Sequence, residues 1–206
     1  SSTSRGLGDV YKRQVYATSG PRIRLQVFAG WSFPKNAEIS EDFSRIGHSF
    51  GVPMGGDLIS PREQNSPPSF LLRAVKDPLD ANLDRLQVIK GWIDGSGREH
   101  EKVYNVAWSD NRALDSEGNL PKVGNTVDLS SGQFTNTIGQ SEFSLKWTDP
   151  DFNPQYQAFY YVRVLQIPTP RNGLLDSLAL QLDSPPRGPK TIQERAYSSP
   201  IWYQPQ

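Results

Sequence analysis

Two alternating segments joined by a glycine-rich stretch constrain the fold of this chain more than any other feature. Each segment places large apolar residues on one face: Leu86, Val88 and Trp92 in the first, and Tyr104, Val106 and Trp108 in the second. The sequence Asp-Gly-Ser-Gly at residues 94–97 lies between them. Alternation of this kind around a short Gly-rich connection is typical of antiparallel pairing. The pattern therefore predicts a long β-hairpin.

Further segments along the chain also have the pattern of strands. They cover residues 22–28, 70–76, 143–147, 158–167 and 191–203. In residues 22–28 the apolar side chains Ile23, Leu25 and Val27 alternate with polar ones, as in a half-buried strand. Residues 158–167 are apolar on both faces, which predicts a central strand covered on both sides.

Turn-forming residues break the rest of the chain into short pieces. Gly and Pro together make 34 of the 206 residues (17 and 17), which favours turns and short strands over long helices. Short helices are predicted for residues 41–49, with Ser40 as N-cap and an end before Gly51, and for residues 174–182. Loops or bends are predicted for residues 57–69, 110–125 and 184–189. These elements predict a mainly β, antiparallel β-sandwich-like domain with one or two short helices.

Composition excludes several classes of function. Lys and Arg number 22 and Asp and Glu also number 22, so the chain lacks the basic excess of a nucleic-acid-binding protein. The absence of Cys excludes disulfides, thiol catalysis and thiolate zinc sites. No apolar run approaches the roughly 18 residues of a membrane-spanning helix. We therefore expect neither a nucleic-acid partner nor a membrane span.

One stretch of the sequence matches the pattern of a catalytic motif. Residues 47–51 match G-x-S-x-G around Ser49, and His100 follows in the order of a serine hydrolase triad. That motif requires a buried strand before the serine and a helix after it, whereas residues 41–46 are mostly polar and Pro53 follows closely. A serine hydrolase using Ser49 is kept as an alternative, and a solvated His100 is the simpler interpretation.

Metal and sugar sites have weaker support. Asp149, Asp151 and Asn153 match the start of a calcium loop, but Pro154 replaces the required Gly, which favours a turn built on side-chain hydrogen bonds. With two His in unrelated contexts, we expect no metal or other cofactor to be held by this chain. The five tryptophans could stack on sugars, so a carbohydrate- or protein-binding module is a second alternative, although core packing is the preferred role for most of them.

The start of the chain has an unusual sequence. Residues 4–14 resemble the in-frame translation of an adapter used in sequencing libraries. We therefore expect residues 1–14 to be a disordered artefact, residues 15–206 to be the authentic β-rich region, and the natural protein to continue upstream of Val15.

Six long strings carry a family resemblance: residues 15–23, 52–58, 80–92, 101–108, 147–152 and 191–203. They resemble the C-terminal part of the bacterial proteins grouped as domain of unknown function 3604, which are similar to the polymerase-and-histidinol-phosphatase (PHP) superfamily. The resemblance implies a metal-dependent hydrolase of the phosphoesterase type, whose divalent metal lies in a barrel that opens with a His-x-His motif. No such motif occurs in these 206 residues.

The resemblance thus implies that this chain is a non-catalytic C-terminal fragment whose partner is the upstream barrel domain. It also implies a periplasmic or secreted location. The residues expected to face the barrel's cleft are Arg22, Asp57, Glu194 and Arg195. An Arg can bind an anionic substrate through two parallel hydrogen bonds, and a loop carboxylate can orient a metal-bound ligand. An ion pair that ties the segments together is the alternative role for these four residues.

Overall fold

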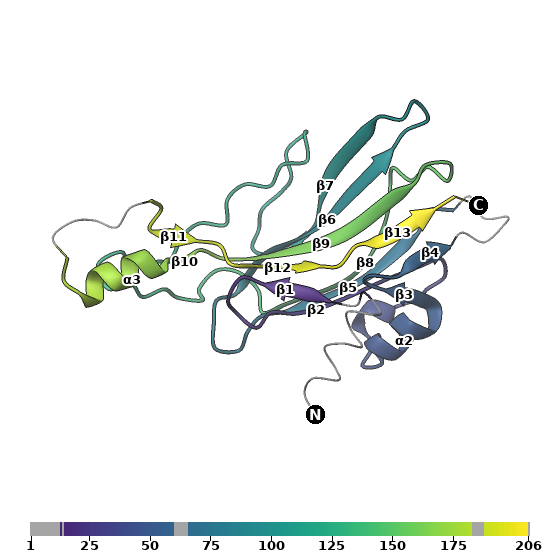
Figure 1. Ribbon diagram of the computed structural model, residues 1–206. Coiled ribbons are helices and arrows are strands. Elements are labelled where there is room, and N and C mark those ends of the chain that lie inside the picture. Colours follow the sequence, from purple (N-terminus) through teal and green to yellow (C-terminus); the bar gives the residue numbers. More distant parts are fainter. Residues whose placement is uncertain (1–12, 14, 60–65, 183–187, 206) are drawn as a thin grey trace.

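The chain folds into two β-sheets that pack face to face (Figure 1). The computed structural model describes residue 13 and residues 15–59, 66–182 and 188–205. The larger sheet contains β1 (Tyr16–Thr18), β4 (Asp57–Ile59), β6 (Leu83–Ile93), β7 (Glu99–Trp108), β9 (Ala158–Gln166), β12 (Arg195–Ser198) and β13 (Ile201–Gln204). The smaller sheet contains β2 (Arg24–Gly30), β3 (Gly51–Pro53), β5 (Ser69–Val75) and β8 (Glu142–Thr148). The predicted β-sandwich-like, mainly antiparallel fold is confirmed.

Strand β9 is the centre of the larger sheet. It pairs with β6 on one side, and β6 continues to β7 as the predicted hairpin. On its other side β9 pairs with β13 through one half and with β12 through the other, so these two short strands follow one another along the same edge. Outside them lie β1, paired with β12, and β4, paired in parallel with β13. The sheet is therefore five strands wide although it contains seven segments.

The main core lies between the two sheets. From β2 and the residue before it, Ile23, Leu25 and Val27 point into this core and are at most 3% exposed, which confirms their predicted alternation. From the larger sheet, the inward residues of β9 and its neighbours complete the core: Tyr160, Val162, Val164, Ala196, Ile201 and Tyr203. Apolar burial between the facing sheets is the main stabilising contribution.

Helices cover the outer face of the smaller sheet. The 3-10 turn η1 (Ala37–Ile39) and the helix α2 (Phe43–Phe50) pack there through a second core that includes Phe28, Phe43 and Leu71 (Figure 1). Helix α2 ends before Gly51 as predicted, but it begins at Phe43, and its N-cap is Asp42 rather than the predicted Ser40. The Ser40 hydroxyl instead accepts a hydrogen bond from the Asp42 backbone N–H, one turn before the helix. The helix approaches the sheet closely, since a Cβ on Gly47 would lie 2.4 Å from the Phe28 ring.

The outer face of the larger sheet has no such cover among the described residues. Burial along β9 alternates, so Phe159 and Tyr161 on the outer face are only half-buried, whereas Tyr160 between them is buried. The expectation that β9 is covered on both sides is therefore wrong. Its outward aromatic side chains instead contact one another and the neighbouring Trp202.

Two other boundaries differ from the prediction. Residues 57–59, expected in a loop, form β4 because their backbone finds a parallel partner in β13, which is remote in sequence. The helix expected at residues 174–182 is α3 (Asn172–Ala179), next to the small sheet of β10 (Thr169–Pro170) and β11 (Thr191–Ile192). The predicted bend at 184–189 lies mostly outside the described residues, as do the loop residues 60–65.

Candidate functional site

The four residues expected at a cleft do not form one cluster. Arg22 is exposed, and its backbone N–H donates to Asp77 at 2.8 Å. Asp57 pairs with Arg13 at 2.6 Å, with both side chains more than half exposed. Glu194 accepts a hydrogen bond from the Ser19 hydroxyl, and Arg195, the next residue, is the first residue of β12. The structure thus brings together only the last two, beside the turn at residues 18–20.

The serine hydrolase motif lies in the opposite structural order to a nucleophile elbow. Ser49 belongs to the last turn of α2, and strand β3 follows it. His100 lies on β7, where its Nε2 is 2.8 Å from Asp94 Oδ2 and its ring stacks on Trp92 at a centroid distance of 5.0 Å. The histidine thus supports the turn of the hairpin.

The calcium-like string forms a hydrogen-bonded turn. Asp149 Oδ1 accepts a hydrogen bond from the Asp151 backbone N–H at 2.9 Å. Asn153 Oδ1 accepts one from the Gln155 backbone N–H at 2.9 Å, as the turn interpretation predicts. Asp149 itself is buried and binds Lys90 Nζ at 2.7 Å. Within the part of the chain that the structure describes, no three His, Asp or Glu side chains are grouped so that they could hold a metal ion.

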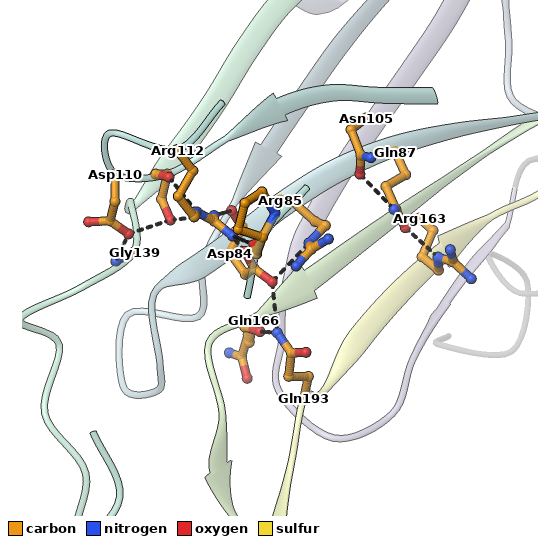
Figure 2. A network of polar contacts seen from close by, with 12 residues as sticks. Asp84, Arg85, Gln87, Asn105, Asp110, Arg112, Gly139, Arg163, Gln166 and Gln193 are labelled. Carbon is orange, nitrogen blue, oxygen red and sulfur yellow. Dashed lines mark hydrogen bonds and ion pairs between the residues drawn. The ribbon is translucent and has the colours of Figure 1, made fainter. Parts of the chain in front are cut away.

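A second buried carboxylate, Asp84 on β6, organises a larger polar cluster. Figure 2 shows the side chains of Arg85, Arg112 and Gln193 converging on it. Arg112 Nη2 donates to Oδ1 at 2.7 Å, while Arg85 Nε and Gln193 Nε2 donate to Oδ2 at 3.0 and 2.8 Å. A buried carboxylate is costly unless it is paired and hydrogen-bonded, and here two guanidinium groups and an amide satisfy it.

The Asp84 cluster supports two segments that line a groove. Arg112 Nη1 also donates to the Pro121 carbonyl at 2.9 Å and so fixes the backbone next to Lys122. Gln193 leads into Arg195 two residues later. Residues 122–125, Pro168, residues 191–193 and Arg195 line the groove, which has a volume of about 610 Å³. We call it the Lys122–Arg195 groove.

This groove is positively charged. Its lining contains Lys122 and Arg195 and no Asp or Glu. Neither cation forms an ion pair with any described residue. Arg195 Nη1 donates to Tyr197 Oη at 3.4 Å. Hydrogen bonding from Arg195, with a further contribution from Arg163, lowers the pKa of the Tyr197 hydroxyl because positive charge favours the phenolate.

Arg163 is oriented by a row of amides across the outer face of the larger sheet. Its Nε donates to Gln87 Oε1 at 2.8 Å, and Gln87 Nε2 donates to Asn105 Oδ1 at 2.8 Å (Figure 2). Asn105 Nδ2 donates in turn to the Gly118 carbonyl at 3.1 Å. This carbonyl can only accept, so it sets the direction of every bond in the row.

An aromatic row occupies the remainder of the same face. Trp202, Phe159, Tyr161 and Tyr197 follow one another, with successive ring centroids 5.4, 6.5 and 6.4 Å apart. Trp202 is 40% exposed. Near Trp202 the face is hollowed by a cavity of about 570 Å³, whose lining combines Phe159 and Trp202 with the carboxylates Glu99 and Glu101. The outer face is thus apolar in its middle, acidic toward the hairpin turn and basic toward the Lys122–Arg195 groove.

A family model described as "Protein of unknown function (DUF3604)" matches residues 7–205. The chain belongs to the DUF3604 family. The match begins inside residues 4–14, whose origin as an adapter stays a prediction. Comparison of this DUF3604 chain with curated proteins and with solved structures gave no match. Among the helices that the structure describes, none has the length and apolar character needed to cross a membrane.

Sequence reasoning missed the two buried carboxylates of this DUF3604 chain. Lys90 shares the inward face of its strand with Leu86, Val88 and Trp92, and a charged residue at an inward position was a usable signal for a buried ion pair. For Asp84 no such signal existed, because its main partner Arg112 comes from an irregular loop.

Proposed function

We propose that this chain is the non-catalytic C-terminal β-sandwich of a larger PHP-like metal-dependent hydrolase, of the phosphoesterase type in the intact protein. Its role is to dock on the upstream barrel domain through the outer face of the larger sheet. The divalent metal and its ligands belong to that barrel.

The observation that carries this proposal is the contrast between the two outer faces. The smaller sheet is covered by α2 and η1, whereas the larger sheet leaves its aromatic row half-exposed. Neighbouring aromatic side chains with one polar rim at each end are typical of the centre of a protein interface. A folded partner that covers this face would remove Trp202, Phe159 and Tyr161 from water.

The docking role is tested with the upstream region of the same gene, produced separately. The 206-residue chain should bind that region, and Trp202→Glu should weaken the complex at least about tenfold because it buries an unpaired carboxylate. Ile39→Glu is the matched control, since Ile39 is 75% exposed and lies in η1, beside the smaller sheet. Equal affinities of the two variants, or no complex at all, would contradict the docking role.

The catalytic assignment is tested by activity. The chain alone, supplied with manganese, zinc or iron, should not hydrolyse phosphoesters, and the intact protein should. Turnover by the chain alone would refute the non-catalytic assignment. Labelling of the chain by a fluorophosphonate probe that disappears in Ser49→Ala would favour the serine hydrolase alternative instead.

The aromatic row also supports a binding module for carbohydrate as a second candidate. Trp202 and Phe159 offer ring faces beside Glu99 and Glu101, whose carboxylates can accept hydrogen bonds from sugar hydroxyls. Binding to a glycan array that is lost in Trp202→Ala and retained in Ile39→Ala would favour this candidate over docking.

A further inference from the structure

We propose that the Lys122–Arg195 groove binds the oxyanion group of a small organic ligand. Arg195 and Lys122 would provide the charge, and the apolar residues of the lining would contact the body of the ligand. This inference rests on the groove alone and does not depend on the docking role or on the chemistry of the intact protein.

The charge of the groove selects an anion. Both cations of the lining lack a counter-ion among the described residues, and the lining offers no carboxylate that would compete with a ligand. A guanidinium group presents parallel N–H donors that match the oxygens of a carboxylate or a phosphate. An oxyanion that binds between Arg195 and Lys122 therefore gains two charge-assisted contacts without displacing an existing pair.

The groove is also held in place before any ligand binds. Asp84 accepts a hydrogen bond from Arg112, and Arg112 Nη1 in turn holds the Pro121 carbonyl next to Lys122. Asp84 also accepts a hydrogen bond from Gln193, which lies two residues before Arg195. Asp84 is fully buried, so both segments are anchored to a rigid strand of the sheet. A site that is already ordered loses less entropy on binding than a mobile one.

The dimensions indicate an organic ligand. The groove has about 610 Å³, within the range of small-molecule sites and far larger than a bare ion. Val123, Ile192 and Pro168 contribute apolar surface to its lining. An oxyanion with a compact apolar body would use both the cations and this surface, and an organic carboxylate and an organic phosphate share that chemistry.

Calorimetric titration of the 206-residue chain tests the proposal with inorganic phosphate, phenyl phosphate and benzoate at constant ionic strength. We expect phenyl phosphate or benzoate to bind more tightly than inorganic phosphate, and the stronger of the two identifies the oxyanion. Lys122→Gln and Arg195→Gln should each weaken binding at least about tenfold, the effect of losing one charge-assisted hydrogen bond. Arg24→Gln is the control, because Arg24 is an exposed arginine of the smaller sheet. Absence of binding by all three probes, or equal effects of all three variants, would overturn the proposal.

A spectroscopic readout separates binding from folding. Arg195 lowers the pKa of Tyr197, so an oxyanion on Arg195 should move the ionisation of this tyrosine to higher pH. The shift should be seen in phenolate absorbance and be absent in Tyr197→Phe. Lys122 is exposed in a loop, so Lys122→Gln tests the site even if Arg195→Gln fails to fold. A Tyr197 ionisation that saturating phenyl phosphate and benzoate leave unchanged would count against the proposed position of the ligand.

Discussion

Replacing Lys90 by Met tests whether the buried ion pair of the sandwich is necessary for its stability. Lys90 Nζ lies 2.7 Å from Asp149 Oδ2, and the two side chains are 4% and 0% exposed. The ammonium group also donates to the Asp151 carbonyl at 2.7 Å, which holds the loop after β8 against the sheet. Met fills a similar volume but leaves the Asp149 carboxylate buried without its counter-ion.

The expected loss follows from what remains around Asp149. Breaking a buried pair costs about 3–5 kcal/mol, because the remaining charge is uncompensated. Asp149 keeps two donors, the Tyr160 hydroxyl at 2.7 Å and the Asp151 backbone N–H at 2.9 Å, so the lower end, about 3 kcal/mol, is expected. For a domain of this size each kcal/mol lowers Tm by roughly 2–4 °C, which gives a decrease of about 6–12 °C.

Urea unfolding of a double-mutant cycle measures this effect. Asp149→Asn is the second single variant, because it keeps an acceptor for Tyr160 while removing the charge. The double variant should be more stable than Lys90→Met alone, since no unpaired charge remains. Lys102→Met, from a half-exposed pair with Asp151, is the control and should change stability little. Loss of stability in Lys102→Met equal to that in Lys90→Met, or strict additivity in the cycle, would refute the reasoning.

Three further variants test other parts of the structure. Gly47→Ala should lower the free energy of unfolding, measured in urea, by about 1–3 kcal/mol, because the added Cβ would overlap the Phe28 ring. This overlap should outweigh the higher helix propensity of Ala, and a more stable variant would show that α2 can move away from the sheet. Hydrogen bonds from the Ser130 hydroxyl and neighbouring donors lower the pKa of Asp128 to about 2, so the stabilisation from its charge is present above about pH 4 and is lost as the pH falls through about 2. Asp128→Asn should therefore be less stable than the parent at pH 7, and the difference should shrink as the pH falls to about 2 and below, as thermal unfolding across this range can check. Arg112→Met should cost about 1.5–3 kcal/mol, because Asp84 loses one charge-assisted hydrogen bond and keeps Arg85 as a counter-ion, and an unchanged Tm would contradict the role given to this cluster.

The fold was predictable where local pattern and long-range pairing agree. The hairpin of β6 and β7 combines apolar residues at alternating positions with a Gly-rich turn, so sequence alone was sufficient to predict it, although not the register shift at Leu86 and Gln87. Strand β4 was missed because it pairs with β13, which is far away in sequence. For β9 the pattern identified the central strand but not the exposure of Phe159 and Tyr161. Aromatic residues occur both on covered and on solvent-facing sides of a sheet, so residue type alone does not distinguish the two.

The site was less predictable than the fold. Arg195 and Glu194 were singled out, but the sequence gives no indication that Lys122 lies across the same groove as Arg195. That proximity depends on Asp84 and Arg112, whose hydrogen bonds join a strand to an irregular loop. The register between segments without regular structure is set by individual side chains, and alternation carries no information about it.

The pairing of β1 with β12 has a consequence for how the chain folds. Tyr16 lies opposite Ser198, and β13 must be in place before β4 has a partner. During synthesis these early strands therefore have no pairing partner until residues 195–204 leave the ribosome, and their hydrogen-bonding edges stay open until then. Loop closure over such separations slows folding, so we expect the larger sheet to be completed after the hairpin and to be the step most sensitive to aggregation.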